Sequence, residues 1–503
     1  MTDCPHEKMT TRKDDLVSHR YNKLEHLRAQ GIDPYPATYH RSHTNAEAIA
    51  LFERIEGGEA DLETRLYLAG RITNMRGMGK HVTFLDIKDG SGKIQVYFRK
   101  DALGEERYER LKDLDLGDII GVEGKLFRTH SGEITLEVAN LTMLAKSLLP
   151  PPEKWHGLAD IEKRYRQRYL DLIANDDVKA IFVTRSRVIS AIRRILDNRG
   201  FIEVETPVLQ ASAGGGMARP FKTYYNALEQ EFCLRIALEL HLKRLVVGGF
   251  DKVYELGRVF RNEGLSTKHN PEFTLLETYE AYADYNDVMR MVEEMVACIA
   301  QEALGATEID CRGEKISLAP PWRRITLRDA IYQYSGVDFQ QYPDAEALGV
   351  KLSELGVPFE GWAGRGKMID ELLTNFVEPN LIQPTFLVDY PLELSPLAKR
   401  KPGSADLVER FEGFMGGMEI CNAFSELNDS QDQEQRFLEQ IAAKLAGDEE
   451  AETLDEDFIT ALKHGMPPTG GLGIGIERLL MVLTDQQSIR EVILFPQLRT
   501  REQ

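Results

Sequence analysis

Residues 252–281 read KVYELGRVFRNEGLSTKHNPEFTLLETYEA, and the fold class of the larger part of the chain follows from this segment. Two extended stretches, 252–263 and 272–281, flank a polar loop, a pattern that predicts a long antiparallel hairpin. Upstream, apolar residues between 188 and 196 recur at helical spacing before Gly200, which predicts a helix that ends there. Long antiparallel strands mixed with helices indicate an α+β domain and not a doubly wound one.

Residues 65–144 carry a different pattern, in which five short runs of strand-forming residues are separated by turn signals. The runs are LYLAGRI, HVTFLDI, KIQVYF, DIIGVEGKLF and EITLEVANLTML. Such strands predict a small Greek-key barrel of the oligonucleotide-binding (OB) type. An amphipathic helix is expected before it, over 11–30, and three prolines interrupt the chain after it. We therefore predict a helical extension, a barrel, a linker and an α+β domain over 1–64, 65–146, 147–175 and 176–503.

Composition restricts the class of protein without naming a function. With 503 residues the chain exceeds what one hydrophobic core holds, and its net charge of −19 argues against coating nucleic acid through a general basic field. The five cysteines lack CxxC spacing, so we expect neither a zinc site nor disulfides, but a reducing cytoplasm. No apolar run is long enough for a membrane span, no secretory signal is evident, and the common nucleotide-binding glycine motifs are absent.

The predicted hairpin carries charged and aromatic residues on shared faces. Because side chains alternate along a strand, Arg261 and Glu263 should share one face of the first arm, and Phe273, Glu277 and Tyr279 one face of the second. Unpaired buried charges are costly, so this face lies in water, pairs internally or binds a charged ligand. An arginine at a phosphate, an aromatic ring against a base and a carboxylate at an amine would bind an amino acid and a nucleotide. Periodicity alone leaves a solvated sheet equally open.

A second hairpin is expected in FEGFMGGMEICNAFSELND, residues 411–429. If Gly416-Gly417 is a two-residue turn, position 414 faces 419 and position 412 faces 421. Glu412 and Glu419 would then be diagonal neighbours within reach of one Mg²⁺ ion, although paired surface carboxylates are common. The opposite face would carry Asn422, Phe424 and Glu426. Only a bulge or a sharp twist could bring all five residues to one pocket.

A glycine-rich segment, GGLGIGIER, occupies residues 470–478. Glycine weakens a strand, so this density predicts that something approaches the backbone closely. Arg478 follows on the first turn of an amphipathic helix, where it could hold a phosphate through two hydrogen bonds. A tight turn with a surface arginine is the alternative.

From about residue 11 to 496 the chain resembles class II lysyl-tRNA synthetases of the bacterial type. The resemblance is carried by RYRQRYLDLI, RGFIEVETP, GGGMARPF, HNPEFTLLETYEAYADY, EICNAFSELND and GLGIGIERLLM. It implies ATP-dependent activation of L-lysine to lysyl-adenylate and transfer to the 3′ end of tRNA(Lys). It also implies an anticodon-binding barrel, Mg²⁺ as the cofactor, a homodimer in the cytoplasm and no membrane partner. Because the attacking carboxylate is already ionised, the reaction requires no general base.

The resemblance also implies roles for individual residues, with Arg261 and Arg478 as the catalytic pair. The implied ATP-binding residues are Arg261, Glu263, His269, Asn270, Phe273, Glu412, Glu419, Gly475 and Arg478, with Glu412 and Glu419 also holding the metal. The implied lysine-binding residues are Gly215, Glu239, Arg261, Glu277, Tyr279, Asn422, Phe424 and Glu426. The implied anticodon-binding residues are Arg76, Phe84, Gln95 and Glu133.

Several points stay open at this level. Leu238 and His241 stand where the family is expected to carry proline and tyrosine, and a core position is the alternative for Phe84. An aspartyl- or asparaginyl-tRNA synthetase is the nearest competing reading, but Glu277 and Glu426 would repel an acidic side chain. A lysine-adding enzyme that modifies proteins resembles the catalytic domain only. A scaffold with a dead catalytic domain is opposed by the residues Arg261, Glu412, Glu419 and Arg478.

Overall fold

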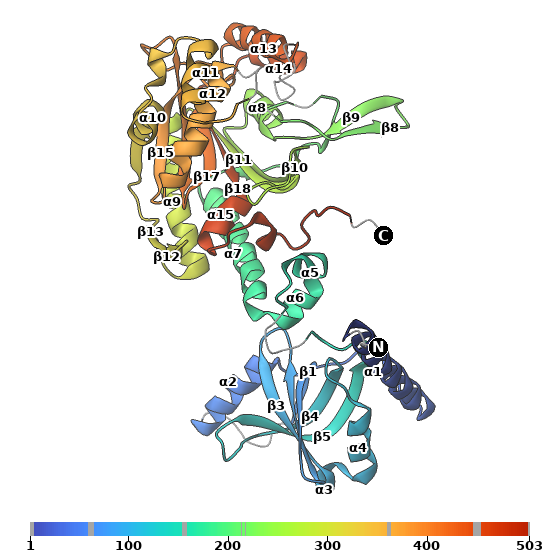
Figure 1. Cartoon of the computed structure of the whole chain (residues 1–503). Coiled ribbons are helices and arrows are strands. Elements are labelled where there is room, and N and C mark those ends of the chain that lie inside the picture. The colour runs from blue at the N-terminus through green and yellow to red at the C-terminus, as the bar shows by residue number, and fades with distance from the viewer. Residues whose placement is uncertain are drawn as a thin grey trace. The chain divides into compact units, whose positions relative to one another are not determined.

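The computed structural model describes residues 5–58, 65–152, 158–212, 214–216, 218–359, 364–445 and 454–500. The chain forms two compact units, Met1–Ala159 and Asp160–Gln503, which are described separately below (Figure 1). Among the described residues, the structure contains no helix with the length and apolar character that a membrane crossing requires.

The first unit is built on a closed barrel with strand order β1-β2-β3-β5-β4, as the sequence predicts. Its strands are β1 (Leu66–Met78), β2 (Val82–Lys88), β3 (Lys93–Arg99), β4 (Ile119–Arg128) and β5 (Ile134–Ala145). Only β3 and β5 pair in parallel. Alternation along the strands sends Leu85, Ile87, Ile94 and Val96 into the core of the barrel, while Asp86 and Gln95 point to the other face of their strands.

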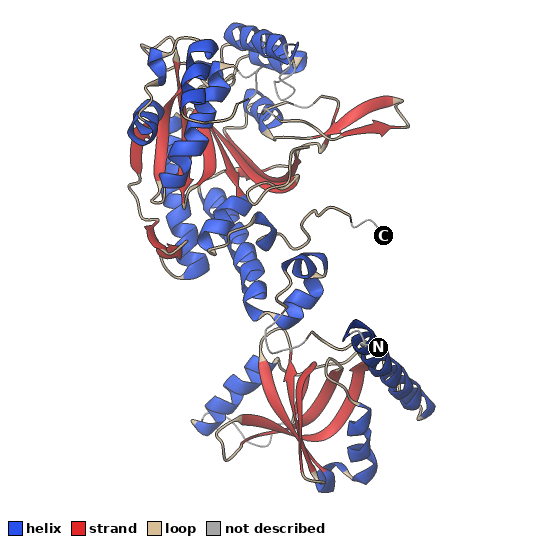
Figure 2. Cartoon of the chain, in the orientation of Figure 1, coloured by secondary structure: helices blue, strands red, loops and turns tan. Residues whose placement is uncertain are grey.

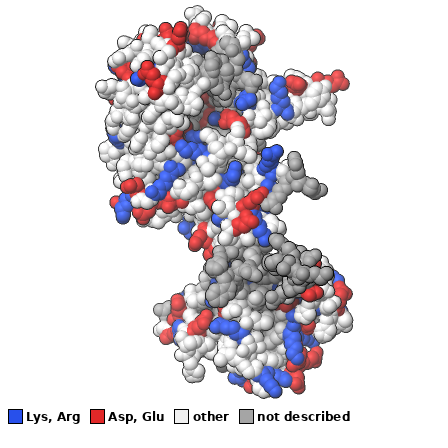
Figure 3. Space-filling view, viewed as in Figure 1, with Lys and Arg blue, Asp and Glu red and all other residues white. Residues whose placement is uncertain are grey.

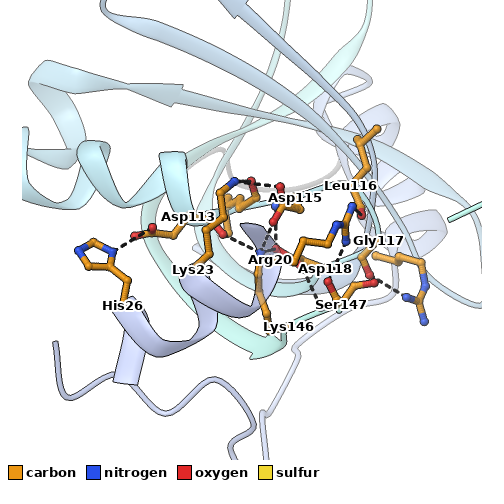
Figure 4. Close-up of polar contacts among 12 residues, drawn as sticks. Arg20, Lys23, His26, Asp113, Asp115, Leu116, Gly117, Asp118, Lys146 and Ser147 are labelled. Atoms are coloured by element: carbon orange, nitrogen blue, oxygen red, sulfur yellow. Dashed lines mark hydrogen bonds and ion pairs between the residues drawn. The ribbon is translucent and has the colours of Figure 1, made fainter. Parts of the chain in front are cut away.

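Helices surround the barrel: α1 (Pro5–Ala29), α2 (Asn45–Glu56), α3 (Lys100–Leu103) and α4 (Glu105–Glu109). The expected N-terminal helix is therefore present as α1. It is joined to the barrel unit by buried polar contacts that link its basic residues to the segments before β4 and after β5 (Figure 4). We call this group the barrel charge cluster; it consists of Arg20, Lys23, Asp115, Asp118 and Lys146.

Each cation of the barrel charge cluster has acceptors within the chain. Lys146 Nζ, fully shielded from solvent, donates to Asp118 at 2.8 Å and to Asp115 at 2.6 Å. Lys23 reaches Asp115 at 2.9 Å, and Arg20 donates to the main-chain carbonyls of Ser147 at 2.7 Å and Leu116 at 2.9 Å. The cluster therefore needs no ligand to complete it.

The second unit is built on an eight-stranded sheet with order β14-β15-β16-β17-β18-β11-β10-β6. The strands are β6 (Ile202–Glu203), β10 (Lys252–Phe260), β11 (Glu272–Ala281), β14 (Arg323–Thr326), β15 (Thr385–Pro391), β16 (Leu407–Met415), β17 (Met418–Ser425) and β18 (Thr469–Gly475). All neighbours are antiparallel except the two outermost pairs. Two smaller sheets comprise β7 (Leu209–Gln210), β8 (Lys222–Tyr225) and β9 (Gln230–Leu234), and β12 (Glu308–Cys311) with β13 (Glu314–Ser317). The predicted α+β class is confirmed.

Helices cover the large sheet (Figure 2). One face packs against α7 (Asp176–Asn198), α9 (Tyr285–Leu304) and α15 (Ile476–Leu483), which form the main core with it. The remaining helices are α5 (Ile161–Arg166), α6 (Arg168–Ala174), α8 (Glu239–Val247), α10 (Leu327–Ser335), α11 (Ala345–Glu354), α12 (Arg365–Leu372), α13 (Ser430–Leu445) and α14 (Glu456–Lys463). The sheet face opposite α7, α9 and α15 carries the candidate site.

Candidate active site

Strand alternation turns a set of polar residues away from the main core. On β11 Leu276 packs into that core, so Phe273, Leu275, Glu277 and Tyr279 face the other side of the sheet. Together with residues of β17 and β18 they line a cavity of about 350 Å³.

Glycines of β18 form the floor of this cavity. Gly473 lies between Glu277 on β11 and Asn422 on β17, and Gly471 lies between Tyr279 and Phe424. A Cβ atom on Gly471 would stand 1.8 Å from Oε1 of Glu426 and 2.8 Å from the Tyr279 ring. The prediction that another group approaches the backbone of this segment closely is confirmed at Gly471.

The hairpin of β16 and β17 contains a bulge that the residue spacing did not reveal. The turn lies at the expected glycines, and Phe414 pairs with Glu419 as predicted. The register then shifts between Gly413 and Phe414, so Glu412 pairs with Asn422 and not with residue 421. The shift brings Asn422, and with it Phe424, onto the face of Glu412 and Glu419. The prediction of opposite faces is therefore wrong.

Arg261 and Glu263 both line the cavity but do not belong to a strand. Because β10 ends at Phe260, the prediction that they share a strand face is wrong. The Arg261 guanidinium lies 5.3 Å from the centre of the Phe273 ring, and its Nε donates to the carbonyl of Ile236 at 3.3 Å. Stacking on Phe273 holds the arginine at one end of the cavity.

Three buried carboxylates, Glu239, Glu277 and Glu426, line the other end, and we call them the cavity acid cluster. Glu277 accepts hydrogen bonds from the main-chain N–H of Leu238 and from the Tyr279 hydroxyl, both at 3.0 Å. Burial, reinforced by the charge of Glu239, nevertheless raises the pKa of Glu277 to about 8. The hydrogen-bond donors around Glu277 therefore do not offset the unfavourable effect of burial and of the neighbouring negative charge on its ionised form.

A buried cation that the sequence reading missed also contacts this cluster. Lys243 on α8 forms ion pairs with Glu239 and Glu426, and its ammonium group lies 5.4 Å from the centre of the Phe424 ring. The four-residue spacing of Glu239 and Lys243, which places both on one face of α8, was the available signal.

The opposite side of the cavity is rich in cations. Arg478 on α15 donates to the Glu419 carboxylate at 2.8 Å and lies 3.1 Å from Nε2 of His269. Lys268 pairs with Glu378 at 2.6 Å. Burial, followed by the nearby Arg478 charge, lowers the pKa of His269, so this imidazole adds little positive charge at neutral pH. The grouping suits a polyanion that competes for these cations.

Glu412 lies beside Glu419 but is held by other residues. Its carboxylate accepts hydrogen bonds from the Tyr390 hydroxyl at 2.8 Å and from Arg410 at 2.5 Å. Arg410 also donates to Oδ1 of Asn422 at 3.1 Å, so it links Glu412 to its cross-strand partner. Burial raises the pKa of Glu412 to about 7, with Arg410 opposing and Glu419 adding to the shift. Neither Tyr390 nor Arg410 was identified from sequence.

Glu412 is not among the described residues that line the cavity, whereas the remaining candidates, Gly215, Asn270 and Gly475, do line it. Gly215 has φ +82°, and a Cβ there would approach that of Glu239 to 3.0 Å, so glycine is required. The amide of Asn270 donates to the carbonyl of Glu272 at 2.7 Å, while its buried Oδ1 lacks a partner among the described residues. Gly475 ends β18 just before Arg478.

The two residues that depart from the family pattern, Leu238 and His241, lie close in the chain to Glu239 of the cavity acid cluster. Leu238 is fully buried, and its N–H donates to Glu277, a bond that a proline in this position could not make. Nδ1 of His241 lies 3.4 Å from Nε2 of Gln210, and burial lowers the pKa of His241. Leu238 therefore adds a donor to the site.

The candidate anticodon residues lie on the barrel. Phe84 on β2 pairs with Arg76 on β1, and its ring centre lies 4.7 Å from that of Tyr97. Phe84 is half-buried and does not belong to the barrel core. A core position for Phe84 is therefore wrong. Nε2 of Gln95 donates to Glu133 at 3.3 Å, and Oε1 accepts from Thr135 at 3.0 Å. Tyr97 extends the aromatic surface, which the sequence reading missed.

Comparison with known proteins agrees with this geometry. The family model for class II tRNA synthetases (D, K and N) matches residues 160–499, and the model for an OB-fold nucleic acid binding domain matches residues 66–144. A lysine–tRNA ligase of Dehalococcoides mccartyi (strain CBDB1) is 56% identical over 489 residues, 97% of this chain and 98% of the relative. Lysine–tRNA ligases of Moorella thermoacetica and Chloroflexus aurantiacus are 55% and 54% identical, each over 99% of the relative and over 98% and 97% of this chain.

Proposed function

Because this chain belongs to the class II lysyl-tRNA synthetases, which activate lysine with ATP and transfer it to tRNA, we propose that both small substrates bind in the cavity on the large sheet. The observation that carries the proposal is the cavity acid cluster. Three buried carboxylates beside one cavity suit a substrate with two ammonium groups. The cluster thus favours a diamino acid over the acidic or amide substrates of the related synthetases.

We infer that lysine lies along the floor formed by β18. Its ammonium groups would be bound by Glu239, Glu277 and Glu426, and its aliphatic chain would lie against Tyr279 and Phe424. Gly215 and Asn422 complete the proposed lysine-binding set. The lysine carboxylate would then point toward Arg261, which sits at the other end of the cavity and faces the nucleotide.

ATP is proposed to occupy the cationic side. Adenine would stack on Phe273, and Arg261 and Arg478 would bind the phosphates through charge-assisted hydrogen bonds. Glu263, His269, Asn270 and Gly475 complete the proposed ATP-binding set. The Arg478–Glu419 ion pair would open as the phosphates arrive, since a triphosphate is the stronger acceptor for the guanidinium.

Glu412 and Glu419 fit a magnesium site. No group of three His, Cys, Asp or Glu side chains poised to hold a metal ion occurs among the described residues. Mg²⁺, however, is usually held by one or two carboxylates together with substrate phosphates. The neighbouring carboxylates, one with a raised pKa, supply suitable oxygen ligands and a charge that a cation would relieve. Bound there, Mg²⁺ would neutralise phosphate charge.

The chain's own residues then have few chemical tasks. The lysine carboxylate attacks the α-phosphorus, and pyrophosphate leaves. Arg261 stabilises the charge that develops at the α-phosphate, and Arg478 holds the departing end of the triphosphate. No proton is abstracted from the nucleophile, so positioning and electrostatics provide the rate enhancement.

We further propose that the barrel unit recognises the anticodon of tRNA(Lys) through Arg76, Phe84, Gln95 and Glu133. Basic and acidic side chains are interspersed over the visible surface (Figure 3), which favours recognition by local contacts over a broad positive field. A cytoplasmic homodimer is proposed as well. The exposed apolar side chains of Val183 on α7 and Ile202 on β6 suit a subunit interface.

Lysine-dependent exchange of pyrophosphate into ATP, compared across all twenty amino acids, tests the substrate. We expect lysine to give the fastest exchange, and a faster amino acid would contradict the proposal. In Glu426→Gln the KM for lysine should rise by the equivalent of about 1.5–3 kcal/mol, because a charge-assisted hydrogen bond is lost, while the KM for ATP stays near that of the wild type. An unchanged KM for lysine would remove Glu426 from the pocket.

A further inference from the structure

Lys243 contacts the cavity acid cluster from outside the cavity. Its side chain has no exposed area, and its ammonium group pairs with both Glu239 and Glu426. Both glutamates line the cavity, whereas Lys243 is not among the described residues that do. The Lys243 ammonium group therefore contacts Glu239 and Glu426 on the side that faces away from the cavity, and the cavity side of both carboxylates remains accessible to a ligand.

A count of charges shows what this arrangement achieves. Glu239, Glu277 and Glu426 bring three negative charges when ionised, and Lys243 brings one positive charge. A bound lysine would bring two ammonium groups, and its carboxylate would face Arg261. The buried charges balance only when such a ligand is present, and an unbalanced buried charge is costly.

We propose that Lys243 is a positioning residue of the lysine pocket, a built-in counter-ion that fixes the carboxylates of Glu239 and Glu426 so that they receive the ammonium groups of a diamino acid. The inference rests on the proposed function, because it takes this cavity as the lysine site. Lys243 acts through the two glutamates and does not touch the substrate.

The electrostatic surroundings of Glu426 support this role. The charged or titratable groups that face it are Glu239 and Lys243 from α8 and Glu277 and Tyr279 from β11. Burial raises the pKa of Glu426 well above its ordinary value, and Lys243 opposes that shift. Burial lowers the pKa of Lys243, but Glu239 and Glu426 together raise it above its ordinary value. Lys243 therefore stays protonated, and its loss would raise the pKa of Glu426 further.

The test is lysine-dependent pyrophosphate exchange by the full-length Lys243→Met variant at neutral pH. We expect the KM for lysine to rise about 10- to 100-fold, with kcat and the KM for ATP near those of the wild type. A comparable rise in the KM for ATP would indicate a packing defect and overturn the inference.

Chemical rescue separates charge from shape. In Lys243→Ala, added propylammonium should lower the KM for lysine, whereas the neutral 1-propanol should not. Equal rescue by both, or rescue by neither, contradicts the counter-ion role. The matched control is Lys146→Met, which removes an equally shielded lysine from the barrel charge cluster. Below its unfolding temperature this variant should keep the wild-type KM for lysine.

Glu426→Gln, assayed in parallel, distinguishes a failure of the proposed lysine pocket from a failure of the counter-ion role of Lys243. If it raises the KM for lysine and Lys243→Met does not, the pocket stands and the counter-ion inference falls. If neither variant changes the KM, both fall. Should Lys243→Met fail to fold, the double variant with Glu426→Gln should recover folding, because removing one partner of a buried pair costs far more than removing both. A double variant that stays unfolded overturns the inference.

Discussion

Two groups of buried charges, the barrel charge cluster and the cavity acid cluster, differ in how their charges are compensated. In the barrel, Lys146 and Lys23 face Asp115 and Asp118, and the cations outweigh burial and lower the pKa of Asp115. In the cavity, three carboxylates share Lys243, and the pKa of Glu277 is raised to about 8 by burial and by Glu239. Each cluster contains a fully shielded lysine, Lys146 or Lys243, so burial alone does not distinguish them. The difference is that every barrel charge has a partner within the chain, including main-chain carbonyls for Arg20, whereas the cavity carboxylates outnumber their one cation.

The largest effect should come from breaking the barrel charge cluster, in which each charge has a partner within the chain. Lys146→Met leaves Asp118 buried without its cation, so we expect a loss of about 3–5 kcal/mol in the free energy of unfolding of the barrel unit. Urea unfolding of the full chain measures the loss, and lysine-dependent pyrophosphate exchange should be unchanged in the folded variant. A fully stable variant would mean that the Lys146–Asp118 ion pair does not stabilise the barrel unit.

The unbalanced cluster should instead make lysine binding depend on pH. In the free protein Glu277 has its pKa raised to about 8, so below that pH it must release a proton before it can pair with an ammonium group. The Kd for lysine should therefore fall by about tenfold per pH unit as the pH rises toward 8, and then level off. Calorimetry in two buffers of different ionisation enthalpy would detect the proton release. A flat profile between about pH 6 and about pH 8 would contradict this reading of Glu277.

A smaller effect should come from the donor that Leu238 supplies. Leu238→Pro removes the N–H that binds Glu277, which should weaken lysine binding by about 1–1.5 kcal/mol. Leu238→Ala is the matched control, because it shortens the side chain and keeps the N–H. If both variants weaken lysine binding equally, the side chain matters and the hydrogen bond does not.

The smallest effect belongs to Gln95 of the barrel, which is buried beside Glu133 and Thr135 and lies outside the barrel charge cluster. Gln95→Ala removes the contacts to Glu133 and Thr135 and a donor for a base edge, so charging efficiency with tRNA should fall by about 0.5–1 kcal/mol. Pyrophosphate exchange without tRNA should not change. A defect in both assays would make Gln95 a structural residue of the protein.

Strand periodicity and glycine density are local signals, and they predicted the barrel, the α+β unit and the candidate residues of the two hairpins and the glycine-rich segment. The other candidates, such as Gly215 and Glu239, were implied by the family resemblance. It placed Asn422 and Phe424 on the wrong face, because one extra residue in β17 reverses the direction of every side chain beyond it, and nothing in the local pattern marks the bulge. Strand periodicity likewise continued past Phe260, so Arg261 was assigned to a strand. Lys243 and Arg410 were missed because their roles depend on partners brought together only by the sheet.

The shielding of the barrel charge cluster also separates two responses to ionic strength. Dissolved ions screen exposed charges over about 3 Å at 1 M salt but act weakly on buried pairs such as Lys146 and Asp118. Contacts to RNA phosphates are exposed and release counter-ions, so they weaken steeply with added salt. A concentrated salt wash should therefore strip bound RNA from the protein while α1 stays docked on the barrel, and removal of the salt should restore a fully competent RNA-binding surface.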